Sequence, residues 1–229
     1  MTLDLDPLTA ISPVDGRYAR YTSALRQTVS EYGLIRTRCL VELRWFQHLA
    51  ETPAINELPP LNNQQSAEID KAIKNFSKAD AEKVKVLEAT TNHDVKAVEY
   101  LVKEKISAIN GLSPYIEFVH FACTSEDINN LSHGLMLQTA MNDEIIPSMQ
   151  EMIDVLAGLA KDYASAAMLS RTHGQVASPT TMGKELANVV VPAQFMVESP
   201  TPKLFLKIIL SVCRVKDFSV SSTAINFPS

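Results

Sequence analysis

One stretch of the chain, residues 143–164, repeats apolar side chains at the spacing of a long packed helix. Steps of four and three residues separate Ile145, Met149, Met152, Leu156, Leu159 and Tyr163. These steps place all six side chains on one helix face, as in coiled coils and helix bundles. Pro147 falls in the first turn, where its missing N–H costs little. A chain with such an element is expected to fold as a helical bundle.

The remainder of the chain favours the same fold class. It has only 7 glycines in 229 residues, and convincing alternating strand patterns are scarce. Helical patterns cover residues 23–51, 64–76, 92–109, 125–141 and the segment from 180 onward. We therefore predict an all-α fold, in which a small N-terminal helical domain precedes the first part of a long-helix bundle.

Two composition changes predict the domain organisation. The run Asn110-Gly111-Leu112-Ser113-Pro114 is typical of a break, so we expect domains over residues 1–110 and 111–188. Residues 189–229 contain no glycine and four of the 12 prolines, and they carry a net charge of +2 against −7 for the rest. We expect these residues to form a divergent, poorly ordered tail, produced by a frameshift, a misassembled gene or a truncated pseudogene. The alternative is a genuine short protein with a novel tail.

Composition excludes several functions. The chain is 46% hydrophobic and 21% charged, which is globular, and its net charge of −5 comes without the clustered basic face that nucleic acids require. Residues 204–213, the longest apolar stretch, are too few to span a bilayer, and the N-terminus lacks a secretory signal. Cys39, Cys123 and Cys213 fit neither a zinc motif nor a disulfide framework. We expect a cytoplasmic protein with no metal, nucleic-acid or membrane partner.

Two candidate anion-binding segments lie in the N-terminal part. Arg17 and Tyr18 follow an Asp-Gly turn, and the planar fork of Arg17 could bind a phosphate or carboxylate. The alternative is an exposed turn with a surface salt bridge. Further on, Thr91 and Asp94 fit a capping box that opens a helix over residues 92–109. This would place His93 near free backbone N–H groups, which attract anions, unless it is simply a solvated histidine beside a cap.

A third candidate segment surrounds Thr124 and Ser125. Thr124 and Asp127 fit another capping box, and the hydroxyl and N–H groups at this helix start could seat a carboxylate. The alternative is capping alone. The flanking His120 and His133 have no partner at metal-ligand spacing and are interpreted as structural histidines.

The fourth candidate segment contains His173, which lies between Thr172 and Gly174. It is expected in a loop before a helix that starts at Ser178-Pro179. Histidine titrates near neutral pH, so His173 could act as a general acid or base. The alternative is an ordinary loop histidine.

Taken together, SPVDGRY, TTNHDVKAVEY, FVHFACTSEDINNLSH and LSRTHGQ, in this order and spacing, resemble the adenylosuccinate lyase family of the fumarase/aspartase superfamily. The resemblance covers roughly residues 8–188. It implies an all-helical homotetramer with a central bundle of long helices. It also implies a carbon–nitrogen lyase that needs no cofactor. Such an enzyme releases fumarate by β-elimination from adenylosuccinate, giving AMP, and from the succinylated aminoimidazole carboxamide ribotide of purine synthesis.

The resemblance also implies roles for single residues. His173 would be the general acid that protonates the leaving nitrogen. His93 would bind and orient the anionic nucleotide substrate, with Asn92 and Asp94 beside it. The other substrate-binding residues would be Arg17 and Tyr18 at the nucleotide end, Thr124 and Ser125 at a carboxylate, and Thr172.

One family motif does not occur in this sequence. It is the signature loop Ser-Ser-x-Met-Pro-x-Lys-x-Asn-Pro, whose serine is the general base, whereas the pair Ser221-Ser222 is followed here by Thr-Ala-Ile-Asn. We therefore expect impaired catalysis. The alternative function is an inactive helical fragment that associates with full-length lyase subunits. A change of substrate to argininosuccinate is a third interpretation, and the segments SPVDGRY and TTNHDV argue against it.

Overall fold

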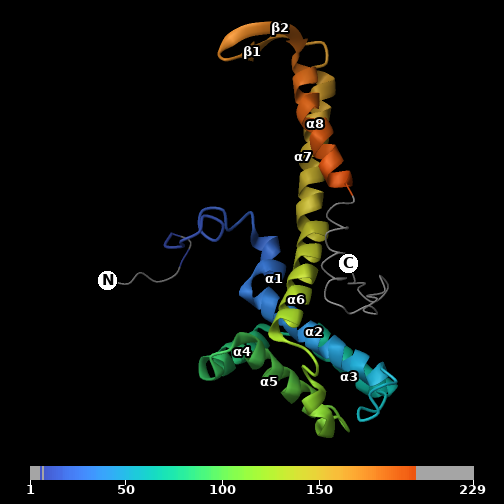
Figure 1. The fold of residues 1–229 in the computed structure, drawn as a ribbon. Coiled ribbons are helices and arrows are strands. Elements are labelled where there is room, and N and C mark those ends of the chain that lie inside the picture. The colour runs from blue at the N-terminus through green and yellow to red at the C-terminus, as the bar shows by residue number, and fades with distance from the viewer. Residues whose placement is uncertain (1–5, 7, 200–229) are drawn as a thin grey trace. The chain divides into compact units, whose positions relative to one another are not determined.

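The computed structural model describes residue 6 and residues 8–199 of the chain (Figure 1). These residues form two compact units that divide between Gln138 and Thr139. Each unit is described by itself below.

The first unit is built from helices, as predicted. They are η1 (Ser23–Leu25), α1 (Arg26–Val29), α2 (Glu31–Glu51), α3 (Asn63–Lys74), α4 (Lys78–Thr91), α5 (Asp94–Ser107), η2 (Ser113–Phe118) and α6 (Ser125–Ala140), whose last residues pass into the second unit. The helix expected over residues 23–51 is divided at Ser30, which is extended and caps α2 by accepting the Gly33 N–H. Helix α4 was not predicted.

The core of the first unit surrounds α2. Phe46, Ile69, Val98 and Ile106, each fully buried, belong to one cluster that joins α2, α3 and α5. A smaller cluster contains Val41, Val95, Ile128 and Leu131, and it joins α2 and α5 to α6. The start of α6 is therefore packed against buried apolar side chains of α2 and α5.

A turn follows α5 where the sequence predicts a break. Gly111 has a φ of +82°, a conformation that glycine adopts without strain. Leu112 and Val119, which follow the turn, are buried in the same cluster as the preceding helices. The division between compact units falls later, after Gln138, and the boundary at residues 110–111 stays a prediction.

The second unit is a pair of helices joined by a β-hairpin (Figure 1). It consists of the π-helical turn η3 (Met141–Ile145), α7 (Ile146–Asp162), β1 (Ala167–Thr172), β2 (Gln175–Thr181) and α8 (Met182–Glu198). The helix predicted from the apolar seam is confirmed as α7, and it lies alongside α8. Strands β1 and β2 pair antiparallel at one end of these helices.

The start predicted for the last helix is wrong. Pro179 lies in β2, and α8 begins at Met182 because the Thr181 hydroxyl accepts the Lys184 N–H. Helix α8 continues past Pro192 to Glu198. Of the predicted divergent tail, residues 200–229 lie outside the described residues.

Helices α7 and α8 approach closely through small residues. A Cβ atom on the buried Gly183 would collide with the Ala160 carbonyl oxygen and with the backbone of Ala164. By contrast, several large apolar side chains of this unit are exposed. They include Met152, Val155, Val191, Phe195 and Met196. No described helix is long and apolar enough to cross a membrane.

Candidate active site

His93 lies at the junction of α4 and α5. Asn92, with a φ of +52°, ends α4 in the left-handed conformation, and the extended His93 is the N-cap of α5. The His93 Nδ1 atom accepts the Lys96 N–H at 3.2 Å. The predicted capping box on Thr91 is therefore wrong, because Thr91 is the last residue of α4. With Nδ1 accepting, neutral His93 carries its proton on Nε2, where the half-exposed ring can donate to a ligand.

The neighbouring Asp94 is already engaged by protein groups. Its Oδ1 accepts the Val95 N–H at 2.8 Å, and its Oδ2 accepts from the Arg38 guanidinium at 2.7 Å. Burial alone would raise the pKa of Asp94, but the Val95 N–H and the Arg38 charge lower it below its ordinary value. Asp94 is thus held as an anion at the first residue of α5.

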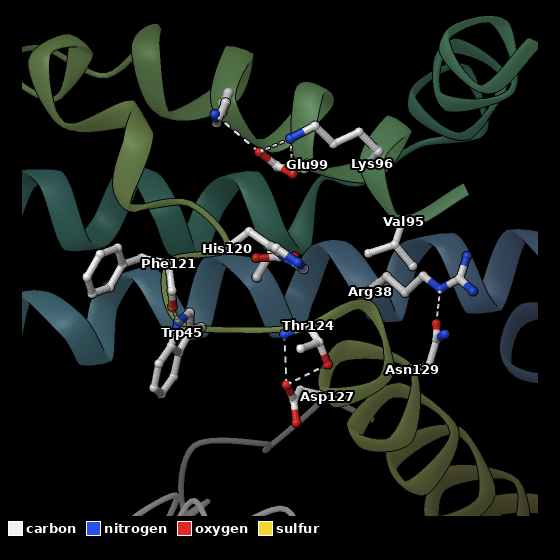
Figure 2. Close-up of polar contacts among 12 residues, drawn as sticks. Arg38, Trp45, Val95, Lys96, Glu99, His120, Phe121, Thr124, Asp127 and Asn129 are labelled. Atoms are coloured by element: carbon white, nitrogen blue, oxygen red, sulfur yellow. Dashed lines mark hydrogen bonds and ion pairs between the residues drawn. The ribbon is translucent and has the colours of Figure 1, made fainter. Parts of the chain in front are cut away.

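Arg38 connects the starts of two helices. It lies on α2, is 4% exposed, and donates from Nε to the Asn129 Oδ1 of α6 at 2.9 Å (Figure 2). One guanidinium thereby contacts both Asp94, the first residue of α5, and Asn129, the fifth residue of α6, so the N-terminal parts of the two helices lie close together. Free N–H groups and the helix dipole make such ends attractive to anions.

Thr124 and Asp127 organise the beginning of α6. The Thr124 N–H and Oγ1 both donate to the Asp127 Oδ2, at 2.8 and 2.9 Å (Figure 2). The predicted pairing is confirmed, with the hydroxyl as donor rather than acceptor. Ser125, the first residue of α6, is half-buried.

The segment before α6 has an unusual backbone. His120 and Ala122 have φ values of +64° and +60°, which are uncommon for residues with a Cβ and occur often at functional sites. The His120 Nδ1 lies 2.5 Å from the Glu42 Oε1, and this hydrogen bond raises the pKa of His120. The Trp45 Nε1–H donates to the Phe121 carbonyl at 2.8 Å (Figure 2).

Arg38, Glu42 and His120 are residues that sequence reasoning missed as parts of this site. A usable signal was present in α2, where two ionisable residues stand one turn apart among apolar ones. Such residues are rarely buried unless they are paired. Their partners, however, lie 56 to 91 residues away in the sequence.

Arg17 and Tyr18 lie in a turn ahead of η1. The Arg17 guanidinium stands 5.5 Å from the centre of the Tyr18 ring, and both residues are exposed. Their described contacts are with each other and with nearby backbone, and the structure does not bring them to α5 or α6.

His173 lies in the second unit, at the tip of the β-hairpin. His173 and Gly174, with φ values of +49° and +76°, form the two-residue turn, and Thr172 pairs with Gln175 across it. Two consecutive positive φ values match the type I′ turn that suits the strand twist. Thr172 and His173 are exposed. Within the described residues, no group of three His, Cys, Asp or Glu side chains could hold a metal ion.

Two solved structures have a similar fold. The fumarate lyase from Mesorhizobium sp. BNC1 matches with a TM-score of 0.58 at 19% identity, over 75% of this chain and 37% of that one. The β-carboxy-cis,cis-muconate cycloisomerase from Acinetobacter calcoaceticus matches with a TM-score of 0.58 at 16% identity, over 83% of this chain and 40% of that one. The chain therefore shares the helical fold of these two proteins over the part that matches.

Sequence comparison identifies the family. Residues 16–198 match the family model described as lyase, and the chain belongs to this lyase family. It is 54% identical over 188 residues to the adenylosuccinate lyase of Haemophilus influenzae, covering 82% of this chain and 41% of that protein. It is 46% identical over 207 residues to that of Legionella pneumophila strain Corby, covering 89% and 45%. The chain spans less than half the length of these relatives.

Proposed function

We propose that this chain acts in the β-elimination of fumarate from adenylosuccinate, giving AMP, and from the succinylated aminoimidazole carboxamide ribotide of purine synthesis. The carrying observation is the neighbouring starts of α5 and α6, where His93 presents Nε2 and Thr124 and Ser125 open the second helix. The 54% identity to an adenylosuccinate lyase supports the choice of substrate.

The first half of the reaction needs an anion-stabilising site. A base removes a proton from the carbon next to a substrate carboxylate, and negative charge builds on that carboxylate. Prearranged N–H and O–H donors stabilise such charge in the transition state. In the proposal, the Ser125 N–H and hydroxyl donate to the ligand directly, and Thr124 donates once its N–H and hydroxyl exchange the Asp127 carboxylate for the ligand. The His93 Nε2–H orients the substrate, beside Asn92 and Asp94. None of the described residues is proposed as the base.

The second half breaks the carbon–nitrogen bond and leaves its electron pair on nitrogen. We assign the proton that this nitrogen needs to His173, with Thr172 beside it, because the exposed ring can approach a bound ligand. Arg17 and Tyr18 would contact the nucleotide end, where the guanidinium suits a phosphate. No metal or organic cofactor takes part. The proposed active form is a cytoplasmic homo-oligomer, a tetramer as in the family.

One observation favours a second candidate function. Met152, Val155, Phe195 and Met196 leave large apolar surfaces of α7 and α8 exposed. Exposed apolar patches of this kind mark association surfaces. The alternative proposal is a catalytically inactive helical chain that associates with full-length lyase subunits, whereas the first proposal is a lyase whose catalysis is impaired.

Fumarate release from adenylosuccinate distinguishes the two candidates. The purified chain is assayed alone and mixed with the full-length Haemophilus influenzae enzyme. Release by the chain alone supports the lyase, whereas no release together with reduced activity of the mixture supports the associating chain.

A variant of His173 tests its proposed role as the general acid. If the chain is active, His173→Gln should lower kcat about a hundredfold or more. His133→Gln, a change to an exposed histidine of α6, is the matched control. Wild-type turnover by His173→Gln would contradict the assigned role.

A further inference from the structure

Three polar side chains form a row on one face of α2. Arg38, Glu42 and Trp45 follow at spacings of four and three residues, which places them above one another on a helix. Each contacts the segment 120–129. Arg38 donates to Asn129 at 2.9 Å and Trp45 donates to the Phe121 carbonyl at 2.8 Å (Figure 2). Between them on the helix, Glu42 accepts from His120 at 2.5 Å.

Burying Glu42 in this row is energetically unfavourable. Its side chain is 0% exposed, and its Oε2 atom has no hydrogen-bond partner among the described residues. Leaving a buried carboxylate oxygen unpaired is unfavourable, and an apolar side chain between the buried Val41 and Leu43 would avoid that cost. The stability of α2 therefore does not account for Glu42.

The contacts of Glu42 and Trp45 coincide with the unusual backbone before α6. His120 and Ala122 are left-handed although both carry a Cβ, a conformation that the surroundings must impose. Glu42 holds the His120 ring, and Trp45 holds the next carbonyl along the chain. Thr124 follows only two residues after Ala122, so this turn sets where its N–H and hydroxyl lie.

Cys123, within the same turn, does not offer another explanation. Burial, the Glu42 charge and the Asp127 charge raise the pKa of its thiol to about 12. A thiol that stays protonated at neutral pH is a poor nucleophile, so the arrangement does not activate it.

We propose that Glu42 is a positioning residue of the candidate site. It holds His120 by Nδ1, leaves the His120 Nε2 directed away from itself, and fixes the turn 120–123 that places Thr124 and Ser125 against an anionic ligand group. The identity of that ligand rests on the proposed function, whereas the positioning itself rests on the contacts of α2 alone.

The test compares three variants of the full chain. Glu42→Gln keeps the shape and one acceptor oxygen but removes the charge, and Glu42→Ala removes the contact. Glu31→Gln is the matched control, because Glu31 lies on the same helix in an exposed pair with Lys85. The readouts are the NMR titration of the His120 ring, the amide signals of Thr124 and Ser125, and the indole signal of Trp45, the only tryptophan. A fumarate titration of the same samples measures binding.

For Glu42→Gln we expect a lower His120 pKa, shifted Thr124 and Ser125 amide signals, and fumarate binding weakened about tenfold. Glu42→Ala should weaken binding further, and Glu31→Gln should match the wild type. Glu99 and Lys96 of α5 also act on His120, and both are unchanged in every variant.

Two results would overturn the proposal. One is unchanged Thr124 and Ser125 signals in Glu42→Gln, and the other is a lower Tm with unchanged fumarate affinity, which is the mark of a purely structural role. If the wild type does not bind fumarate, the proposed function fails in this chain. The Thr124 and Ser125 amide signals then still decide whether Glu42 positions the turn, and Glu42→Gln supplies the answer even where Glu42→Ala fails to fold.

Discussion

The two compact units use their apolar side chains in opposite ways. In the first, Phe46 and Val98 are 0% exposed and lie within one cluster that joins several helices. In the second, Phe195 and Met196 are 74% and 65% exposed, and the close approach of α7 to α8 depends on Gly183. Apolar periodicity thus predicts a helix and its apolar face equally well in both units, but it does not reveal whether the same unit covers that face.

The largest expected effect is loss of the first unit's core. Phe46→Ala should lower the free energy of unfolding by about 3–5 kcal/mol, because it removes a fully buried ring and leaves a cavity. Val191→Ala in α8, where the side chain is 67% exposed, should change it by about 0.5 kcal/mol or less. Urea unfolding followed by far-UV circular dichroism, which reports the helices of both units, measures both. Equal effects of the two changes would break the contrast between the units.

Tight backbone packing is the corresponding weak point of the second unit. Gly183→Ala should cost about 2 kcal/mol, because the new Cβ meets the Ala160 carbonyl oxygen and the Ala164 backbone. Gly158→Ala in α7 is the control, because nothing lies within 4 Å of its Cβ position. That change should stabilise the helix by about 0.5–1 kcal/mol. Amide hydrogen exchange in α7 and α8 should become faster in Gly183→Ala and slower in Gly158→Ala. Faster exchange in both variants would contradict the close packing at Gly183.

A third change separates buried from exposed ion pairs. Arg38→Met should cost about 1.5 kcal/mol, a value that allows for the solvent around the half-exposed Asp94. Arg44→Met breaks the more exposed pair with Asp70 and should cost about 0.5 kcal/mol. Urea midpoints of the two variants test the order. The reverse order would show that the α5–α6 junction does not depend on Arg38.

The smallest expected effect is a dependence on pH. The Glu42 hydrogen bond raises the pKa of His120 in the folded chain, so the folded state binds this proton more tightly than the unfolded state does. The resulting stability is fully present below the unfolded value of about 6.5 and is lost as pH rises through the raised pKa. The stability difference between wild type and Glu42→Gln should therefore shrink as pH rises. A difference that is constant from about pH 6 to 9 would contradict the pairing.

The sequence predicted the elements whose signals are local. The seam from Ile145 to Tyr163 is a repeated spacing, and α7 follows from it. The turn at Gly111 needs a left-handed residue, which glycine supplies. The β-hairpin was missed because Arg171 and Val176 pair across a short turn without strict alternation, and a bulge interrupts the register. Helix α4 was missed because its sequence, KADAEKVKVLEATT, is mostly polar.

The candidate site was predictable only where its residues form a local sequence pattern. Thr124 and Asp127 are three residues apart, so their pairing can be inferred from spacing. His93 was identified, but its capping role depends on Asn92 ending α4 one residue earlier. The Arg38 and Glu42 contacts depend on how α2 packs, which no local pattern contains.

Two backbone hydrogen bonds join α7 to α8 and determine where His173 is held. The Gly183 N–H donates to the Tyr163 carbonyl, and the Met182 N–H donates to the Ala166 carbonyl, both at 2.9 Å. These bonds join the end of α7 to the start of α8 where the hairpin begins. His173 lies beyond these bonds on a ribbon of two strands, whose stiffness comes from its own ladder. The length of this two-stranded ribbon therefore sets how far the His173 ring lies from the ends of α7 and α8.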